Sequence, residues 1–165
     1  MPQVPPAFSG PLSVEPRNAR SKRMMRQQRQ QIKLVTEQPL ELIDISAQVR
    51  GFFERNAIEA GLLHVASQHT TLAVAVNERC EALQQDMLNF LQDLAPAQRD
   101  YRHNRIAVDG RPNAHSHLLA LLIPSQVSLI VADGRLELGQ WQSVFAVELD
   151  GPRPERNVTL TLIGE

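Results

Sequence analysis

The spacing of hydrophobic residues changes several times along this chain, and each change predicts a different secondary structure. Ile32, Leu34 and Thr36 alternate with Lys33 and Val35, which indicates a strand with one buried face. Further strands are predicted where apolar residues run together, at 40–43, 62–67, 71–76 and 144–149.

Two stretches instead repeat every three or four residues, as the buried face of a helix does. The first predicts a helix over about 46–58, which Asp44 or Ser46 can cap. The second predicts a helix that ends before Pro96. Its apolar side comprises Cys80, Leu83, Met87, Phe90, Leu91 and Leu94. A shorter helix is expected over 113–122.

The last forty residues return to the spacing of strands. Residues alternate over 127–131, and Asp133-Gly134 is a typical hairpin turn. A final alternating strand is expected at 158–162. Runs of strands interrupted by a few helices, without regular alternation of the two, predict an α+β domain with a largely antiparallel sheet and a few packed helices.

The composition fits one folded domain, with 165 residues, 42% of them hydrophobic, and a net charge of −1. Charge is unevenly spread: residues 1–30 contain six Lys or Arg and one Glu, and the remaining residues carry a net charge of −6. Five prolines and scattered polar residues predict a disordered extension over 1–26, followed by a domain over 27–165. Because the domain is acidic, we do not expect nucleic acid as a partner.

Localisation follows from what the sequence lacks. No apolar run reaches the roughly 20 residues of a membrane-spanning helix. The N-terminus has no apolar segment typical of a secretory signal. Cys80 is the single cysteine, which excludes an internal disulfide and a cysteine-based zinc cluster. We therefore expect a cytoplasmic protein without a membrane partner.

Polar residues interrupt two apolar strands at Ser67-Gln68-His69-Thr70-Thr71. If the second strand is regular, His69, Thr71 and Asn77 share one face, and Glu78 lies at the end of the strand. An imidazole near a carboxylate can act as an acid–base pair or hold a metal. A hydrogen-bonded strand end without such a role would explain the same residues.

Histidines recur in two later segments. Tyr101-Arg102-His103-Asn104 is typical of a binding loop, or simply of a surface turn. His115 and His117 would share a face in a strand, as some metal ligands do, but not in a helix. For a helix we favour His117 as the residue that faces the site. His64 lies within an apolar strand, where a hydrogen-bonded structural role is expected.

The C-terminal part adds an aromatic residue and two arginines. Trp141, the only tryptophan, lies between Gln140 and Gln142. Arg153 and Arg156 can bind a phosphate through their planar guanidinium groups, or they can be solvated in a turn between two strands. The sequence has no glycine-rich phosphate loop and no serine nucleophile motif.

Taken in order, these segments resemble one family. The shared motifs are His69-Thr70-Thr71, Asn77-Glu78, Tyr101-Arg102-His103-Asn104, Asn113-Ala114-His115-Ser116-His117-Leu118, Asp133-Gly134-Arg135-Leu136, Leu138-Gly139, Trp141-Gln142, Glu148-Leu149-Asp150-Gly151-Pro152-Arg153 and Ile163-Gly164-Glu165. The resemblance is to the YjbQ family, also called uncharacterised protein family 0047 or the secondary thiamine-phosphate synthase family. It covers about residues 30–165.

The resemblance implies a compact α+β domain that assembles as a homotrimer. It implies catalytic roles for His69, Glu78 and His117. The residues that would bind substrate are Thr70, Thr71, Asn77, His103, Asn104, Asn113, Trp141, Gln142 and Arg153. A divalent metal (Mg, Mn or Zn) would be held by His69, His115 and His117. Relatives often have an acidic residue at position 115, so this chain lacks that carboxylate and can prefer a different metal.

The activity that the resemblance implies joins a hydroxymethylpyrimidine pyrophosphate to a thiazole phosphate, giving thiamine phosphate and pyrophosphate. We therefore expect a transferase that acts on phosphorylated small molecules. The alternative is a metal- or small-ligand-binding protein without this turnover, because the same histidines would serve that role.

Overall fold

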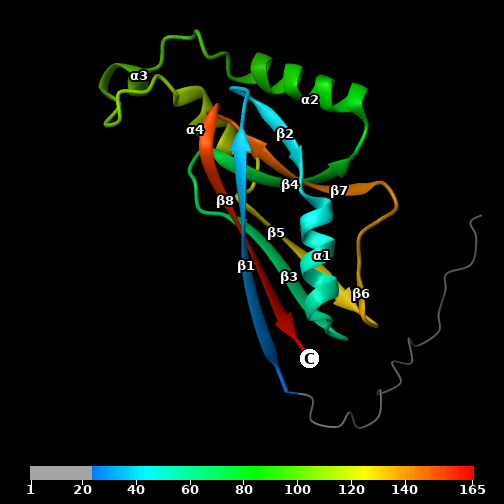
Figure 1. The fold of residues 1–165 in the computed structure, drawn as a ribbon. Coiled ribbons are helices and arrows are strands. Elements are labelled where there is room, and N and C mark those ends of the chain that lie inside the picture. Colours follow the sequence, from blue (N-terminus) through cyan, green and yellow to red (C-terminus); the bar gives the residue numbers. More distant parts are fainter. Residues whose placement is uncertain (1–23) are drawn as a thin grey trace, which may run out of the picture.

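The structure is a computed structural model that describes residues 24–165, so all but the last three residues of the predicted extension lie outside the described residues. Figure 1 shows the elements in their spatial arrangement. In chain order they are β1 (Arg26–Thr36), β2 (Glu41–Asp44), α1 (Ser46–Asn56), β3 (Gly61–Ser67), β4 (Leu72–Glu78), α2 (Glu81–Leu94), α3 (Arg102–Ile106), α4 (Ala114–Ala120), β5 (Gln126–Ala132), β6 (Arg135–Leu136), β7 (Gln142–Glu148) and β8 (Arg153–Gly164). The short helix α3 lies where we predicted a loop.

The larger sheet has five antiparallel strands in the order β1-β8-β3-β5-β6. β1 and β8 pair along nearly their whole length, from Arg26 opposite Gly164 to Thr36 opposite Arg153. The strand thus begins before the alternating pattern at Ile32, because polar residues can join a sheet through backbone hydrogen bonds without a buried face.

The smaller sheet has three antiparallel strands in the order β2-β7-β4, and both of its faces are covered. Val144, Phe145, Ala146 and Val147 of β7 are all at most 1% exposed. A strand that is buried on both faces reads as a continuous apolar run, which explains why this segment shows no alternation.

One face of the smaller sheet, the inner face of the larger sheet and α1 enclose the main core (Figure 1). The start of α1 is tied to this core. Asp44 Oδ1 accepts a hydrogen bond from the Ser46 backbone N–H at 2.8 Å, and the Ser46 hydroxyl accepts one from the Val144 backbone N–H at 2.8 Å. Both residues therefore stabilise this junction, but the prediction that one of them caps the helix is wrong, because the N-cap is Ile45 and no side chain makes a cap hydrogen bond.

The opposite face of the smaller sheet packs with α2 and α4 in a second core. Leu91 of α2, Leu119 of α4 and Phe145 of β7 are buried there. The rest of the predicted apolar side of α2 is only partly covered, since Phe90 is 63% exposed and Leu94 is 46% exposed. One chain therefore leaves apolar surface of α2 in contact with solvent.

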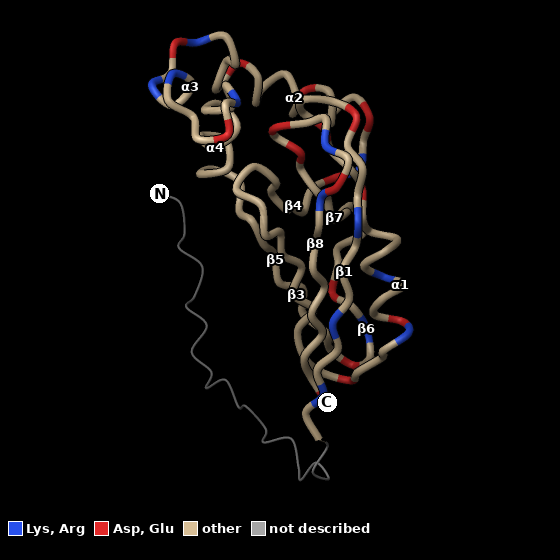
Figure 2. Tube along the Cα trace, turned by 60° about the vertical axis from the view of Figure 1, so that its left-hand side comes forward, with Lys and Arg blue, Asp and Glu red and all other residues tan. Residues whose placement is uncertain are grey.

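The hairpin turn and the role of His64 on the outer face of the larger sheet are as the sequence predicts. Asp133 has a φ of 51° and Gly134 a φ of 68°, as a type I′ hairpin turn requires. β3 and β5 contain no charged residue, as Figure 2 shows. His64 on this outer face shares hydrogen bonds with Ser128 at 2.9 Å and Gln126 at 3.2 Å, the structural role expected for it.

The sheets and helices confirm an α+β domain with antiparallel pairing. None of the helices within residues 24–165 is long and apolar enough to cross a membrane.

Candidate functional site

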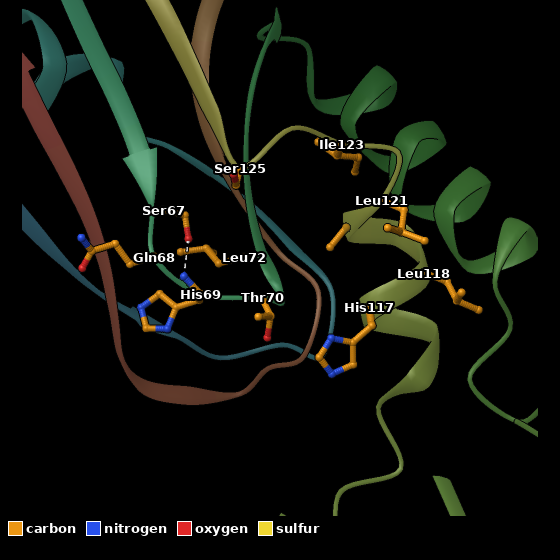
Figure 3. A pocket seen from close by; sticks show the side chains of 11 residues that line it. Ser67, Gln68, His69, Thr70, Leu72, His117, Leu118, Leu121, Ile123 and Ser125 are labelled. Carbon is orange, nitrogen blue, oxygen red and sulfur yellow. Dashed lines mark hydrogen bonds between the residues drawn. The ribbon is translucent and has the colours of Figure 1, made fainter. Parts of the chain in front are cut away.

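The β3–β4 loop faces α4 across a cavity (Figure 3), and a second cavity adjoins it. The two cavities share the lining residues Gln68, His69, Thr70 and His117. The structure therefore brings together His69 and His117, the two histidines at the centre of the predicted site, although they are far apart in the sequence.

The two cavities differ in their chemistry. The first has a volume of about 280 Å³ and an otherwise polar lining of Thr71, Asp109, Arg111, Asn113, Asp150 and Arg156. The second has a volume of about 570 Å³ and an apolar wall that includes Leu72, Leu118, Leu121 and Ile123. A charged group fits the first cavity and an apolar ring fits the second.

His69 lies in a turn and not in a strand. The Ser67 hydroxyl accepts a hydrogen bond from the His69 backbone N–H at 3.1 Å, and β4 begins only at Leu72. The expectation that His69, Thr71 and Asn77 share one strand face is therefore wrong. The turn directs His69 into the cavities instead (Figure 3).

The ring of His69 is held in one protonation form. The backbone N–H of Asn157 donates a hydrogen bond to Nε2 of His69 at 2.9 Å. Because a backbone amide can only donate, Nε2 is the unprotonated nitrogen, and the ring proton lies on Nδ1. Burial, followed by the positive charge of Arg156, lowers the pKa of His69. His69 is therefore a neutral imidazole near pH 7 that offers an N–H donor.

His117 projects from α4 and rests against a second histidine. Its ring meets the ring of His103 edge to face, with centroids 5.0 Å apart and an angle of 80° between the planes. His103 Nε2 and Asn113 Oδ1 are 3.1 Å apart, and Asn113 Nδ2 donates to Asp150 Oδ2 at 2.9 Å. Since the Asn113 nitrogen donates to Asp150, its oxygen accepts from His103. This chain of hydrogen bonds positions the ring that supports His117.

Asn104 has a different part in the same region. Its Oδ1 accepts a hydrogen bond from the backbone N–H of Ala114 at 3.0 Å, in the first turn of α4. An N-terminal N–H of a helix has no partner inside the helix, so this contact satisfies it. Asn104 therefore fixes the start of the helix that carries His117.

Asp150 forms ion pairs with two arginines beside the polar cavity. Its Oδ2 lies 2.5 Å from Arg153 and 3.4 Å from Arg111. Arg111 also lies 3.0 Å from Asp109, and the backbone N–H of Arg111 holds the pKa of Asp109 below its ordinary value. Arg111 lines the cavity, whereas Arg153 contacts Asp150 behind it.

A buried ion pair lies beneath the polar cavity. Glu148 is 0% exposed and Arg156 is 5% exposed. Arg156 donates two hydrogen bonds to the Glu148 carboxylate, at 2.7 and 2.6 Å, and one to the Thr71 hydroxyl at 3.0 Å. Burial alone would raise the pKa of Glu148, but hydrogen bonds from Arg156 and from the Asp150 backbone outweigh it and lower the pKa. Arg156 is thereby fixed under Thr71.

The predicted metal ligands do not converge in one chain. Consecutive residues of an α-helix are rotated by about 100°, so His115 and His117 point to different sides of α4. His115 lines a separate cavity of about 370 Å³, together with Leu119 and Leu149. Within residues 24–165, no group of three or more His, Cys, Asp or Glu side chains is placed to hold a metal ion.

Four predicted site residues lie at the far end of the smaller sheet. Glu78 pairs with Gln142 and Asn77 with Ser143, whereas Leu72, next to the cavities, pairs with Glu148. Trp141 is 69% exposed at this far end. The Gln142 side chain accepts a hydrogen bond from the Gly139 backbone N–H at 2.8 Å, within its own turn. One chain therefore separates Asn77, Glu78, Trp141 and Gln142 from His69 and His117.

Sequence reasoning missed several residues that build the cavities. Gln68, Asp109, Arg111 and Asp150 line the polar cavity, and Glu148 supports it from below. Glu148 had a visible signal, because a lone carboxylate within an apolar strand requires a buried partner. Asp109 and Arg111 had no such signal, since they lie in an irregular segment whose position the sequence does not specify.

The fold and the site define an antiparallel α+β protein with a polar, histidine- and arginine-lined cavity joined to an apolar one, of a size that suits small molecules. The chain belongs to the YjbQ family: residues 30–165 match the family described as UPF0047 protein YjbQ-like.

Relatives in archaea and bacteria share most of the chain. A UPF0047 protein of Methanothermobacter thermautotrophicus is 39% identical over 136 residues, which cover 82% of this chain and 92% of the relative. The UPF0047 protein YjbQ of Escherichia coli O157:H7 is 28% identical, with coverage of 74% of this chain and 96% of the relative.

Solved structures show the same fold. A YbjQ-like protein of unknown function from Sulfolobus solfataricus superposes with a TM-score of 0.82 at 34% identity, covering 86% of this chain and 100% of that one. A hypothetical protein of Aeropyrum pernix has a TM-score of 0.78 at 37% identity, covering 84% of this chain and 99% of that one. The predicted family and fold class are thereby confirmed.

Proposed function

We propose that the chain is a transferase that forms thiamine phosphate from a hydroxymethylpyrimidine pyrophosphate and a thiazole phosphate in the site around His69 and His117. The observation that carries this proposal is the joining of a polar and an apolar cavity through those two histidines. Each substrate has a charged phosphate and a flat ring, and the two cavities suit these two parts.

The reaction places specific demands on the protein. The C–O bond between the pyrimidine methylene and the pyrophosphate breaks, and the pyrophosphate leaves with the electron pair. The thiazole nitrogen donates its lone pair to the methylene carbon, and a C–N bond forms. No atom is oxidised or reduced by an outside reagent, so the protein has to bind the rings in contact and stabilise the leaving group.

The residues of the polar cavity suit these demands. Arg111 lines the cavity and, although it also pairs with Asp109 and Asp150, is partly solvated and can donate to a phosphate. The Nδ1–H of neutral His69 and the hydroxyl of Thr70 supply further hydrogen-bond donors. His117 can transfer a proton to the leaving oxygen. Arg156 stays paired with Glu148 and contributes its charge from beneath the cavity.

A divalent metal is part of the family expectation, with His69, His115 and His117 as ligands. These three histidines do not fit one ion in a single chain, because His115 lines a separate cavity. We therefore assign no step of the reaction to a metal. We also propose that the protein assembles as a homotrimer, as the family resemblance implies.

The test is product formation from the two phosphorylated precursors. The purified protein should form thiamine phosphate, and His117→Ala should reduce the rate by about 100-fold or more, the usual contribution of a general acid or base. His64→Gln is the matched control, because His64 lies on the outer face of the larger sheet and should leave the rate unchanged. Ligand binding without any product would favour the alternative, a ligand-binding protein without this turnover.

A further inference from the structure

The predicted site residues form two groups at opposite ends of the smaller sheet. Glu78 and Trp141 lie at one end, and His69 and His117 at the other. Gln142 and Glu148, at the two ends of β7, are six residue steps apart, and at about 3.3 Å per step this is roughly 20 Å. A small ligand between His69 and His117 of one chain cannot reach Trp141 of the same chain.

Both ends expose apolar side chains to solvent. At the cavity end, Leu118 is 42% exposed, Leu121 is 79% exposed and Leu122 is 65% exposed. Leu118 and Leu121 belong to the apolar wall of the larger cavity (Figure 3), and Leu122 follows them in the chain. At the other end, Trp141 is 69% exposed. A large aromatic side chain and an open apolar wall are complementary surfaces, since burying both removes apolar area from water.

The charges at the two ends are also complementary. Arg102 begins α3 on the cavity side and Arg99 lies in the turn before it. No ion pair joins either arginine to an acidic residue of the described chain. Figure 2 shows basic residues at α3. At the other end, Glu78 and Glu81 have no ion-pair partner within residues 24–165. Opposite charges at two separate ends favour contact between two copies of this chain.

We propose that Trp141 and Glu78 of one copy cover the Leu118–Leu122 surface of a second copy and complete its His69/His117 site. This rests on the proposed function, because it takes the cavities as the working site. The contact joins two different surfaces of the same chain, and such head-to-tail contacts close into rings when the rotation permits. Each ring would then contain as many complete sites as it has copies.

The fluorescence of Trp141 tests this contact directly, because it is the only tryptophan. In the assembled protein its emission should be that of a buried indole, and dilution should shift it to longer wavelength as the copies separate. Leu121→Asn should weaken association roughly tenfold to hundredfold, as expected for losing one buried leucine contact, and should give the exposed spectrum.

The matched control is Leu62→Asn. Leu62 is 48% exposed on the uncharged outer face of the larger sheet, another surface that a second copy could cover. Under the proposal this variant keeps the oligomer and the buried Trp141 spectrum. If Leu62→Asn disrupts assembly and Leu121→Asn does not, the copies meet through the sheet and the proposal is wrong. A monomer with exposed Trp141 at all concentrations also overturns it.

Cross-linking locates the contact without a substrate. In a Cys80→Ser background, Gln140→Cys and Leu122→Cys would be placed on separately tagged copies and treated with a short bismaleimide. Cross-linked pairs should form in the co-expressed mixture and not with either variant alone. Cross-links absent from the mixture would contradict the proposed contact.

Complementation links the contact to the site. His117→Ala and Trp141→Ala copies should each lose activity, and their mixed oligomers should regain part of it. If the cross-links form but the protein never makes thiamine phosphate, the proposed contact between copies stands and the proposed reaction is wrong. If the wild type is active but the mixed oligomers regain no activity, the proposed reaction stands and the site shared between copies is wrong.

Discussion

Replacing Glu148 with Gln tests whether the buried ion pair supports the site. The carboxylate accepts hydrogen bonds from Arg156, from the Thr36 hydroxyl and from the backbone N–H groups of Leu149 and Asp150. Two donors face one oxygen and three face the other. An amide nitrogen in either position would therefore leave at least two donors without an acceptor, and Arg156 would become a buried, uncompensated charge.

The expected loss of stability is large. Removing one partner of a buried ion pair costs about 3–5 kcal/mol. The glutamine oxygen keeps some of the hydrogen bonds, so we expect the free energy of unfolding of Glu148→Gln to fall by about 3 kcal/mol, toward the lower end of that range. Urea unfolding at pH 7, followed by circular dichroism, measures this loss.

An exposed ion pair provides the control. Lys33 and Glu155 lie 3.5 Å apart with side chains 68% and 54% exposed, so Glu155→Gln should change the free energy by no more than roughly 1 kcal/mol. The double variant Glu148→Leu with Arg156→Met removes both charges and should recover much of the stability. A Glu148→Gln loss no larger than that of the control would refute the reasoning.

The same carboxylate predicts a pH dependence. Its pKa in the folded protein lies below the ordinary value of 4.5, so its contribution is fully present above pH 4.5 and is lost as the pH falls through the folded pKa. The stability difference between the wild type and Glu148→Gln should therefore narrow only in acid. A difference that is constant from pH 7 to below pH 4 would contradict this assignment.

Three further substitutions test the geometry of the site. Asn113→Ala removes the link between His103 and Asp150, and it should lower kcat/KM roughly tenfold to hundredfold while the melting temperature changes little, which steady-state kinetics and thermal unfolding measure together. Arg111→Ala should weaken the binding of thiamine phosphate about tenfold by calorimetry, whereas Arg105→Ala, which breaks only a surface pair, should not. Gly151→Ala should lower the melting temperature clearly, because a Cβ there would lie 2.0 Å from the Gln38 carbonyl oxygen; an unchanged melting temperature would contradict the tight packing of this loop.

Much of the fold could be predicted because its local signals agree with its packing. The apolar run before Asp150 lies in a strand that is buried on both faces, and Asp133-Gly134 has the turn conformation that its composition favours. The helix after Cys80 is where its spacing predicted it. The exposure of Phe90 and Leu94 was not predictable, because spacing shows which residues share a face but not what covers that face.

The site could be predicted only in part for a related reason. His69 and His117 lie together because a turn and a helix from distant segments meet beside β7, and motif order alone suggested this. The pairing of Glu148 with Arg156 depends on the alignment of two strand ends, which no short sequence pattern specifies. The distance of Glu78 and Trp141 from the cavities follows from the register of β4 and β7, which sequence spacing likewise did not show.

The most direct test of the central claim is nuclear magnetic resonance of the histidine side chains during a titration with thiamine phosphate. The chain has five histidines, so their ring signals can be assigned individually by substitution. The signals of His69 and His117 should shift strongly and saturate together, whereas the signal of His64 on the outer sheet face should not move. Saturable shifts at His64 without shifts at His69 and His117, or no saturable shift at all, would contradict a phosphorylated-ligand site between His69 and His117.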